Sequence, residues 1–90
     1  MLRYEIIVKG RVQGVGFRAF TENIAENLGV KGYVRNLPDG TVEVVAEADK
    51  QTLDELCSKL KAGPSMAYAD ELAITEKQFT GEFRDFSVKF

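Results

Sequence analysis

Hydrophobic and polar positions alternate with a period of two at both ends of the chain. Near the amino terminus the apolar positions are the even-numbered residues from Leu2 to Val8, and near the carboxyl terminus they are Phe86, Val88 and Phe90. This period puts apolar side chains on one face of a strand. The pattern therefore predicts a first strand over residues 2–9 and a short strand at the carboxyl end.

Two other segments have the three- and four-residue spacing that is typical of amphipathic helices. The first has apolar residues at Phe17, Phe20, Ile24 and Leu28 and is followed by Gly29. The second has them at Leu53, Leu56, Cys57 and Leu60, with Asp49 as the candidate amino-terminal cap and Gly63-Pro64 as the stop. Caps and glycine stops of this kind mark the two ends of a helix, so we expect two helices here.

Between the helices, residues 30–36 and 41–48 flank the turn Leu37-Pro38-Asp39-Gly40 and predict a β-hairpin. Residues 70–77 predict a further strand, with uncertain register. The resulting order predicts an α+β, ferredoxin-like βαββαβ sandwich with an antiparallel sheet of four to five strands and two helices on one face. At 90 residues, the chain has room for one domain, residues 1–90.

Composition narrows the possible chemistry. There is no histidine, which excludes Ser-His-Asp and Cys-His catalysis and every histidine-ligated metal site. The lone Cys57 lies in the apolar stripe of the second helix and is interpreted as a core thiol. The amino terminus has no basic leader followed by an apolar run, so we expect a soluble cytoplasmic protein without a membrane partner.

The segment between the first strand and the first helix is rich in glycine and ends on an arginine. It reads Gly10-Arg11-Val12-Gln13-Gly14-Val15-Gly16-Phe17-Arg18. Glycines allow successive backbone amides to point into one concavity, and a helix start adds unpaired N–H groups. Residues 1–36 also hold half of the twelve Lys and Arg but only three of the fourteen Asp and Glu. The sequence therefore predicts a phosphate-sized anion site here, with Arg18 able to bind two oxygens.

Three other functional interpretations of the sequence are rejected. Residues 14–19 fit G-x-G-x-x-G/A, but the acidic ribose ligand expected about twenty residues later in that motif is missing. No G-x-x-x-x-G-K-[ST] motif is present. The strand predicted over residues 41–48 has no aromatic residue to stack on bases, so a nucleic-acid partner is not expected.

Together, the run from Gly10 to Arg18 and the run from Gly32 to Glu43, which contains Asn36 and the Pro-Asp-Gly turn, resemble the acylphosphatase family. The resemblance covers nearly the whole chain. It implies an acylphosphatase, an enzyme that hydrolyses acyl phosphates to a carboxylate and inorganic phosphate without cofactor or metal. It further implies that Arg18 binds phosphate and that Asn36 orients the attacking water. The phosphate would also be held by the backbone amides of Val12, Gln13, Gly14, Val15, Gly16, Phe17 and Arg18.

Several points stay open at this level. Asn36 is also a common residue for starting a turn. Gln13 is a candidate brace for the loop, and Arg11, Lys31 and Arg35 are interpreted as solvated charges with a lesser role in steering an anion. The alternative function is an acyl- or carbamoyl-phosphate-binding module within a larger assembly. We expect a monomer, while the acyl group of the substrate is not determined by these residues.

Overall fold

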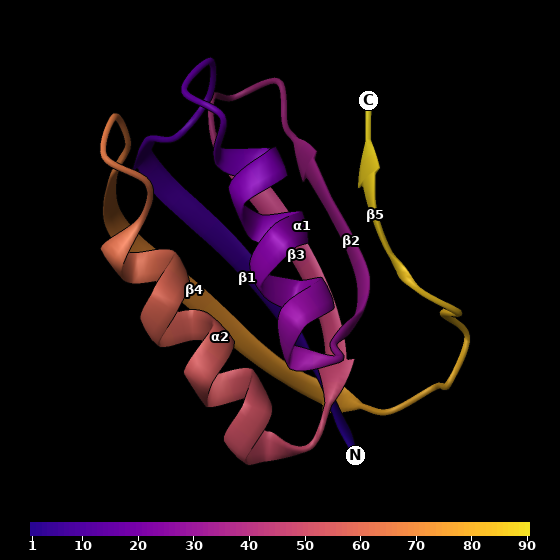
Figure 1. Cartoon of the computed structure of the whole chain (residues 1–90). Coiled ribbons are helices and arrows are strands. Elements are labelled where there is room, and N and C mark those ends of the chain that lie inside the picture. The colour runs from indigo at the N-terminus through magenta and orange to yellow at the C-terminus, as the bar shows by residue number, and fades with distance from the viewer.

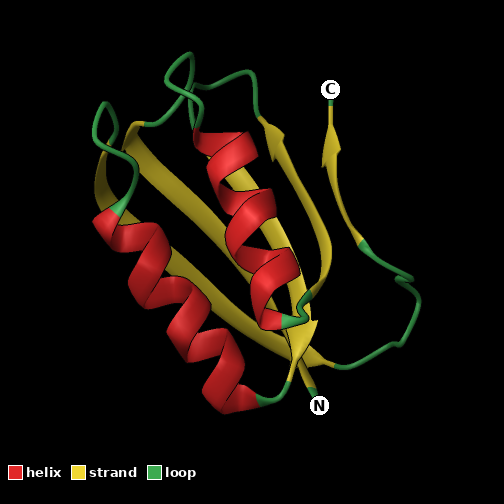
Figure 2. Ribbon diagram, in the orientation of Figure 1, coloured by secondary structure: helices red, strands yellow, loops and turns green.

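Two helices cover one face of a five-stranded sheet in the computed structural model, which describes residues 1–90 (Figure 1, Figure 2). The elements, in chain order, are β1 (Leu2–Arg11), α1 (Phe17–Leu28), β2 (Lys31–Asn36), β3 (Val42–Ala48), α2 (Lys50–Ala62), β4 (Tyr68–Gln78) and β5 (Phe86–Lys89). The predicted ferredoxin-like α+β fold is confirmed, including both helices and the hairpin.

The strand order across the sheet is β4-β1-β3-β2-β5. Three of the four neighbouring pairs are antiparallel, and the fourth, β2 with β5, is parallel. The sheet is therefore mixed, whereas the sequence predicted an antiparallel sheet. The reason is that the chain leaves β4 at one edge and crosses to the opposite edge before β5 begins (Figure 1).

The core lies between the helices and the sheet face that carries the alternating apolar residues. Ile6 and Val8 of β1 and Val42 and Val44 of β3 are fully buried there. On the helix side, α2 contributes its predicted stripe of Leu53, Leu56, Cys57 and Leu60, all buried. The burial of this apolar surface is the main favourable contribution to folding.

The ends of the helices follow the local signals in the sequence. Asp49 caps α2 by accepting a hydrogen bond from the backbone N–H of Thr52 at 2.8 Å. Gly29 ends α1 with a φ of 75°, and N–H groups at this end bond back to the carbonyls of Ala25 and Glu26. A positive φ at this position is strained for residues with a Cβ, which is why glycine is the usual helix stop.

The first and fourth strands are longer than predicted. Residues 10 and 11, expected to start the loop, continue β1 instead, and β4 begins at Tyr68 rather than at residue 70. The pairing of β1 with β4 shifts register between Lys9 and Gly10. A Cβ on Gly10 would lie 2.1 Å from the carbonyl oxygen of Tyr68, so the two backbones approach this closely only because residue 10 is glycine.

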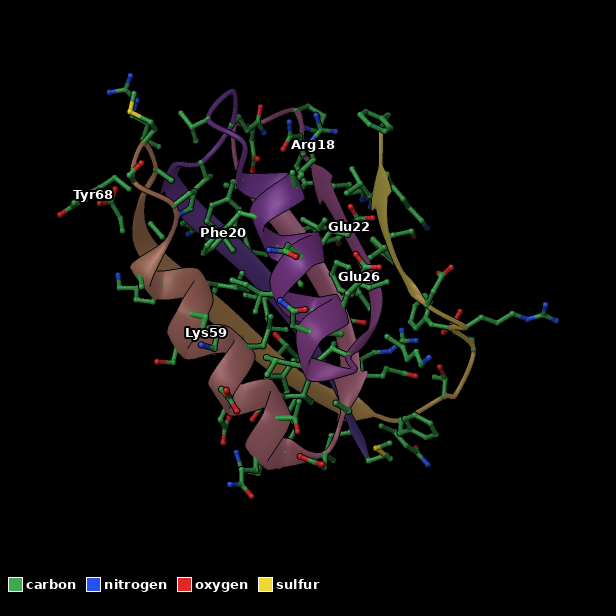
Figure 3. The ribbon with its side chains drawn as sticks, in the orientation of Figure 1. Arg18, Phe20, Glu22, Glu26, Lys59 and Tyr68 are labelled. Atoms are coloured by element: carbon green, nitrogen blue, oxygen red, sulfur yellow. The ribbon has the colours of Figure 1, made fainter.

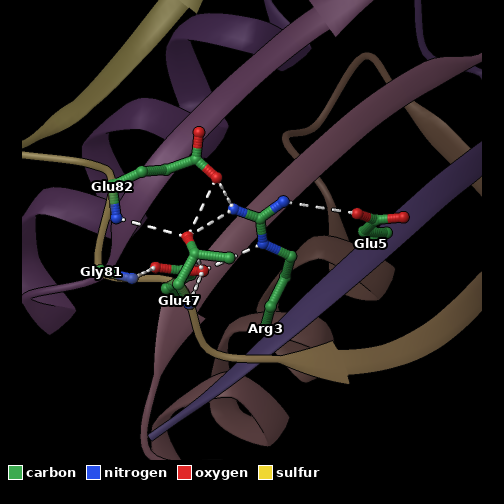
Figure 4. A network of polar contacts seen from close by, with 6 residues as sticks. Arg3, Glu5, Glu47, Gly81 and Glu82 are labelled. Carbon is green, nitrogen blue, oxygen red and sulfur yellow. Dashed lines mark hydrogen bonds and ion pairs between the residues drawn. The ribbon is translucent and has the colours of Figure 1, made fainter.

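A buried carboxylate fastens the β4–β5 connection to the sheet (Figure 4). Glu47 is 2% exposed and accepts hydrogen bonds from the backbone N–H groups of Thr80 and Gly81, at 2.9 and 3.0 Å. The Nε of Arg3 donates to the same carboxylate at 3.0 Å, and the Arg3 guanidinium also pairs with Glu82. These contacts fix where the connection crosses the sheet and so help to position β5.

Candidate active site

The segment from Val12 to Gly16 joins β1 to α1 at the end of the sheet where the β2–β3 turn and the carboxyl terminus also lie (Figure 1). The side chains of Val12 and Phe17, on either side of the glycines, are buried in the core and hold the ends of the loop. Gly14 and Gly16 have φ values of 74° and 78°. A Cβ on either residue would meet no atom within 4 Å, so glycine is needed here for the backbone conformation and not for space.

The amino terminus of α1 has free hydrogen-bond donors. Gly16 occupies the cap position and has no side chain to accept from the first N–H groups, and no acidic residue stands in the first turn. Uncapped N–H groups and the positive end of the helix dipole attract an anion. The loop and the helix start therefore offer hydrogen-bond donors at the position where the sequence predicts an anion site.

Gln13 connects this loop to the β2–β3 turn. Its side-chain Nε2 donates to the carbonyl oxygens of Leu37 and Thr41, at 2.8 and 2.7 Å. The same turn is closed by the N–H of Gly40, which donates to the carbonyl of Leu37 at 3.1 Å. Gln13 thus braces the loop, a role that the sequence left open, and its partners lie just beyond Asn36 in the chain.

Arg18, in the first turn of α1, is half-buried and points toward the carboxyl end of β5 (Figure 3). Its Nη1 donates to the carbonyl oxygen of Lys89 at 3.2 Å, and its guanidinium carbon lies 4.6 Å from the centre of the Phe90 ring. These contacts leave most of its N–H groups available. Arg18 takes part in none of the five ion pairs of the molecule, so no carboxylate neutralises its charge.

Asn36 is the last residue of β2 and is half-buried. Its Oδ1 is buried and receives no hydrogen bond, and it is the only buried side-chain polar atom in the molecule without a partner. Such an acceptor costs about 1–3 kcal/mol when it stays unsatisfied. A partner from outside the protein, such as water or a ligand, would remove that cost.

One cavity of about 610 Å³ brings these groups together. Its lining includes Arg18, Asn36, three residues of the loop segment, residues from α1 and β5 and the last residue of the chain, namely Val12, Gly14, Gly16, Phe17, Ala19, Glu22, Ser87, Val88 and Phe90. Arg18 and Asn36 come from different elements but share this space. Of the loop residues expected to contribute amides, Gln13 and Val15 are absent from the lining, since Gln13 faces the turn and Val15 packs against the core.

The other basic residues of the amino-terminal half do not line the cavity. Arg35 pairs with Glu43 at 2.6 Å on the opposite face of the sheet, and Lys31 donates to the backbone oxygen of Arg84 at 2.9 Å. Arg11 is exposed. Arg18 is thus the one basic side chain of the cavity wall.

The contribution of β5 and of Glu22 to the cavity was not predicted from the sequence. The alternation of Phe86, Val88 and Phe90 predicts a strand, but it does not indicate which neighbour that strand pairs with. Parallel pairing with β2, which sets Val88 opposite Val34, brings the last residues of the chain beside Arg18. Glu22 follows Arg18 by four residues, and this spacing was the available signal that both lie on one side of α1.

Cys57 lies outside the cavity and is buried, as predicted for a core thiol. Burial raises the pKa of its thiol to about 11, so the group is protonated at neutral pH. No group of three or more Asp, Glu, His or Cys side chains is arranged to hold a metal ion. None of the helices is both long enough and apolar enough to span a membrane.

The fold and the cavity together define a ferredoxin-like α+β domain with an arginine and an uncapped helix start in its cavity. The family model described as acylphosphatase matches residues 4–88. An acylphosphatase of Methylococcus capsulatus is 47% identical over 88 residues, which cover 98% of this chain and 96% of that protein. The chain belongs to the acylphosphatase family, and it is an enzyme of the hydrolase class.

Solved structures agree with this assignment. The crystal structure of acylphosphatase from Bacillus subtilis superposes with a TM-score of 0.96 at 37% identity, covering all of both chains. Full-length HypF, in a phosphate- and nucleotide-bound form, contains a similar region with a TM-score of 0.86 at 28% identity, which covers 99% of this chain and 12% of HypF. The same fold therefore occurs both as a protein of this length and as a small part of a much longer one.

Proposed function

We propose that the cavity hydrolyses acyl phosphates to a carboxylate and inorganic phosphate by direct attack of water on phosphorus. In this proposal Arg18 and the loop amides bind the phosphoryl oxygens, and Asn36 orients the water. The observation that carries it is the meeting, in one cavity, of an unpaired arginine, an uncapped helix start and a buried amide oxygen without a partner. These are the groups needed to hold a phosphoryl dianion and one water molecule.

The reaction is compatible with these residues alone. The water oxygen forms a bond to phosphorus while the bond from phosphorus to the acyl oxygen breaks, and the electron pair of that bond leaves on the carboxylate. A carboxylate is a stable anion that needs no proton from a general acid, so the absence of histidine is no obstacle. The remaining work is positioning and charge stabilisation.

Asn36 suits the positioning role. Its Oδ1 can accept a hydrogen bond from the water, but an amide is too weakly basic to remove the proton fully. The proton passes to the phosphate product or to solvent after the bond to phosphorus has formed. We therefore assign Asn36 to orientation of the water and not to proton abstraction.

We further propose that the reaction needs neither metal nor cofactor, because Arg18 and the amides of the loop residues that line the cavity supply the positive charge opposite the phosphoryl group. We place the enzyme in the cytoplasm, acting as a monomer on a small acyl phosphate and without a nucleic-acid or membrane partner. The single buried thiol and the absence of disulfides are in keeping with a reducing compartment. No observation favours the alternative of a binding module in a larger assembly.

The test uses benzoyl phosphate, whose loss is followed by ultraviolet absorbance, with the purified chain in the presence of a chelator. We expect turnover well above the spontaneous rate, unchanged by the chelator and lowered by about a thousandfold in kcat/KM in Arg18→Ala. Arg84→Ala is the matched control, because it removes an exposed arginine far from the cavity and should keep full activity. Wild-type protein that does not exceed the spontaneous rate would remove the proposal. Dependence on added magnesium would remove the metal-free mechanism.

A further inference from the structure

The cavity is larger than the phosphoryl group that the loop would hold. Its volume of about 610 Å³ equals that of roughly twenty water molecules in the liquid. Arg18, Asn36 and the loop glycines account for one end of it. The remaining wall is formed by Ala19 and Glu22 of α1 and by Ser87, Val88 and Phe90 at the end of the chain. If the phosphoryl group occupies the loop, the acyl group meets this second wall.

Most of the second wall is small or apolar, and Glu22 is its only charged side chain. Glu22 stands one helical turn after Arg18, and Figure 3 shows both on the side of α1 that faces β5. Residues four apart on a helix have Cβ atoms about 5–6 Å apart. The carboxylate is therefore close to the anion site without being part of it.

No polar contact within the protein explains the carboxylate of Glu22. It is half-buried, yet it takes part in none of the ion pairs and in none of the side-chain hydrogen bonds, although Arg18 is its helical neighbour. It lies beyond the first turn of α1 and so does not cap the helix. A carboxylate near an anion site also repels the phosphoryl group. Its oxygens are acceptors for which the protein offers no donor.

We infer that Glu22 determines which acyl groups the enzyme accepts. It favours acyl phosphates whose acyl part carries a hydrogen-bond donor or a positive charge, because such a group can donate to the free carboxylate. It disfavours acyl groups that carry a second anion, because two negative charges would face each other in a partly desolvated cavity. This inference rests on the proposed function, since it assumes that the phosphoryl group occupies the loop.

The experiment compares kcat/KM for two pairs of substrates that differ in one property each. Acetyl and carbamoyl phosphate have nearly the same shape but present a methyl or an amino group, which isolates the donor. The 4-methyl and 4-carboxy derivatives of benzoyl phosphate isolate the added anion. Each ratio is measured for wild type, Glu22→Gln and Glu22→Ala, with the spontaneous rates subtracted. Glu26→Gln is the matched control, because Glu26 is the next acidic residue along the same side of α1 but does not line the cavity (Figure 3).

We expect the carbamoyl-to-acetyl ratio to fall about tenfold in Glu22→Ala, the size expected for losing one hydrogen bond to a charged acceptor. The carboxy-to-methyl ratio should rise several-fold in Glu22→Gln, and this rise should shrink in high salt because a partly exposed charge is screened. Glu26→Gln should leave both ratios at the wild-type values. A purely structural role would lower all four rates together and leave the ratios unchanged.

The outcomes separate this inference from the function it rests on. If wild type hydrolyses the four substrates but the Glu22 variants shift neither ratio more than Glu26→Gln does, the inference is wrong and the proposed function stands. If wild type hydrolyses none of them above the spontaneous rate, the proposed function itself is wrong. Circular dichroism shows whether the variants are folded, and Glu and Gln have nearly equal helix propensities.

Discussion

At the scale of single residues, Arg18 and Asn36 share a cavity but differ in what they would touch. Arg18 has an unpaired charge suited to an anion, whereas Asn36 has an unpaired acceptor suited to water. Asn36→Ala should therefore lower kcat at least about a hundredfold by misplacing the water, with little change in competitive inhibition by phosphate. Arg18→Ala should lower kcat/KM by about a thousandfold and also weaken phosphate binding at least about tenfold. Steady-state kinetics with phosphate inhibition constants measures both effects.

Arg18→Lys is the control for this comparison, because it keeps the charge but loses the planar fork, and we expect it to restore little activity. Circular dichroism confirms that each variant is folded. If Asn36→Ala were fully active, or if Arg18→Ala bound phosphate as tightly as wild type does, the corresponding role would have to be given up.

Gln13 acts on the site indirectly, by holding the loop against the turn that follows Asn36. Gln13→Ala leaves the carbonyls of Leu37 and Thr41 without its donor, so we expect a loss of about 1–3 kcal/mol in unfolding free energy. Activity should fall about tenfold or more, because the loop is no longer held in a fixed position relative to Asn36. Gln13→Glu should be worse, since a carboxylate would face two carbonyl oxygens. Urea unfolding and kcat measurements test this.

Gln51→Ala is the matched control, because that glutamine is exposed on α2 and makes no hydrogen bond with its side chain. Equal behaviour of the Gln13 and Gln51 variants would show that the two bonds contribute nothing to the site. A Gln13→Glu variant as active as wild type would contradict the positioning role directly.

At the scale of elements, the parts that were predicted correctly are those specified by local sequence. Helix α2 has a capping aspartate, a regular apolar stripe and a glycine stop, and the β2–β3 turn has Gly40 at a position with a φ of 92°. The pairing of β5 could not be predicted in this way. Alternation in Phe86 and Val88 shows that they form a strand, but its neighbour is set by the long-range path of residues 79–85.

The same distinction applies to the site. The loop and Arg18 are adjacent in sequence, so their chemistry was visible as a pattern of glycines ending on an arginine. The wall formed by Ser87, Val88 and Phe90 depends on the β2–β5 pairing and was missed. The unpaired state of the Asn36 oxygen was also beyond sequence reasoning, because it depends on every atom that surrounds it.

Glu47 is the element-scale feature most open to test, because it anchors the connection that delivers β5. Burial opposes ionisation of its carboxyl group, but hydrogen bonds from Thr80, Arg3 and Gly81 outweigh burial and hold its pKa below the ordinary value. A carboxyl group with a lowered folded-state pKa stabilises the fold above its unfolded-state pKa, and this contribution disappears as pH falls through the folded-state pKa. Glu47→Gln should thus be less stable than wild type by about 1–3 kcal/mol at pH 7.

The difference in unfolding free energy between wild type and Glu47→Gln should disappear as the solution is acidified below the folded-state pKa of Glu47. The wild-type residue is then neutral as well. Urea unfolding from pH 7 down to strongly acid conditions follows this convergence. Glu43→Gln is the matched control, since Glu43 lies on the same strand and the same face as Glu47. Its carboxylate pairs with the exposed Arg35. This substitution should cost at most about 1 kcal/mol at any pH. If the difference in unfolding free energy between wild type and Glu47→Gln stayed constant with pH, the ionised form of Glu47 would contribute nothing to stability.

At the scale of the whole molecule, the sheet is open at both edges, and we expect the long edge strand β4 to govern whether copies associate. A free edge presents unpaired N–H and C=O groups to other chains. Most of β4 is exposed, and it carries Asp70, Glu71 and Glu76 against the single Lys77. A second copy pairing along this edge would bring the same carboxylates, so like charges would meet across the new ladder.

We therefore expect a monomer of 10.0 kDa by light scattering across a wide range of protein concentration, with a radius of gyration near the 11.7 Å of the Cα trace. That value agrees with the ~12 Å expected for a folded chain of this length.

The double substitution Glu71→Gln with Glu76→Gln should produce higher-mass species, because it removes two of the repelling charges from the edge. The same charge change made on the helices, Glu26→Gln with Glu55→Gln, should leave the protein monomeric, because no open strand edge lies there. If both double variants associated equally, net charge and not the β4 edge would control association. A wild-type dimer that persisted at all concentrations would show that the acidic edge does not keep copies apart.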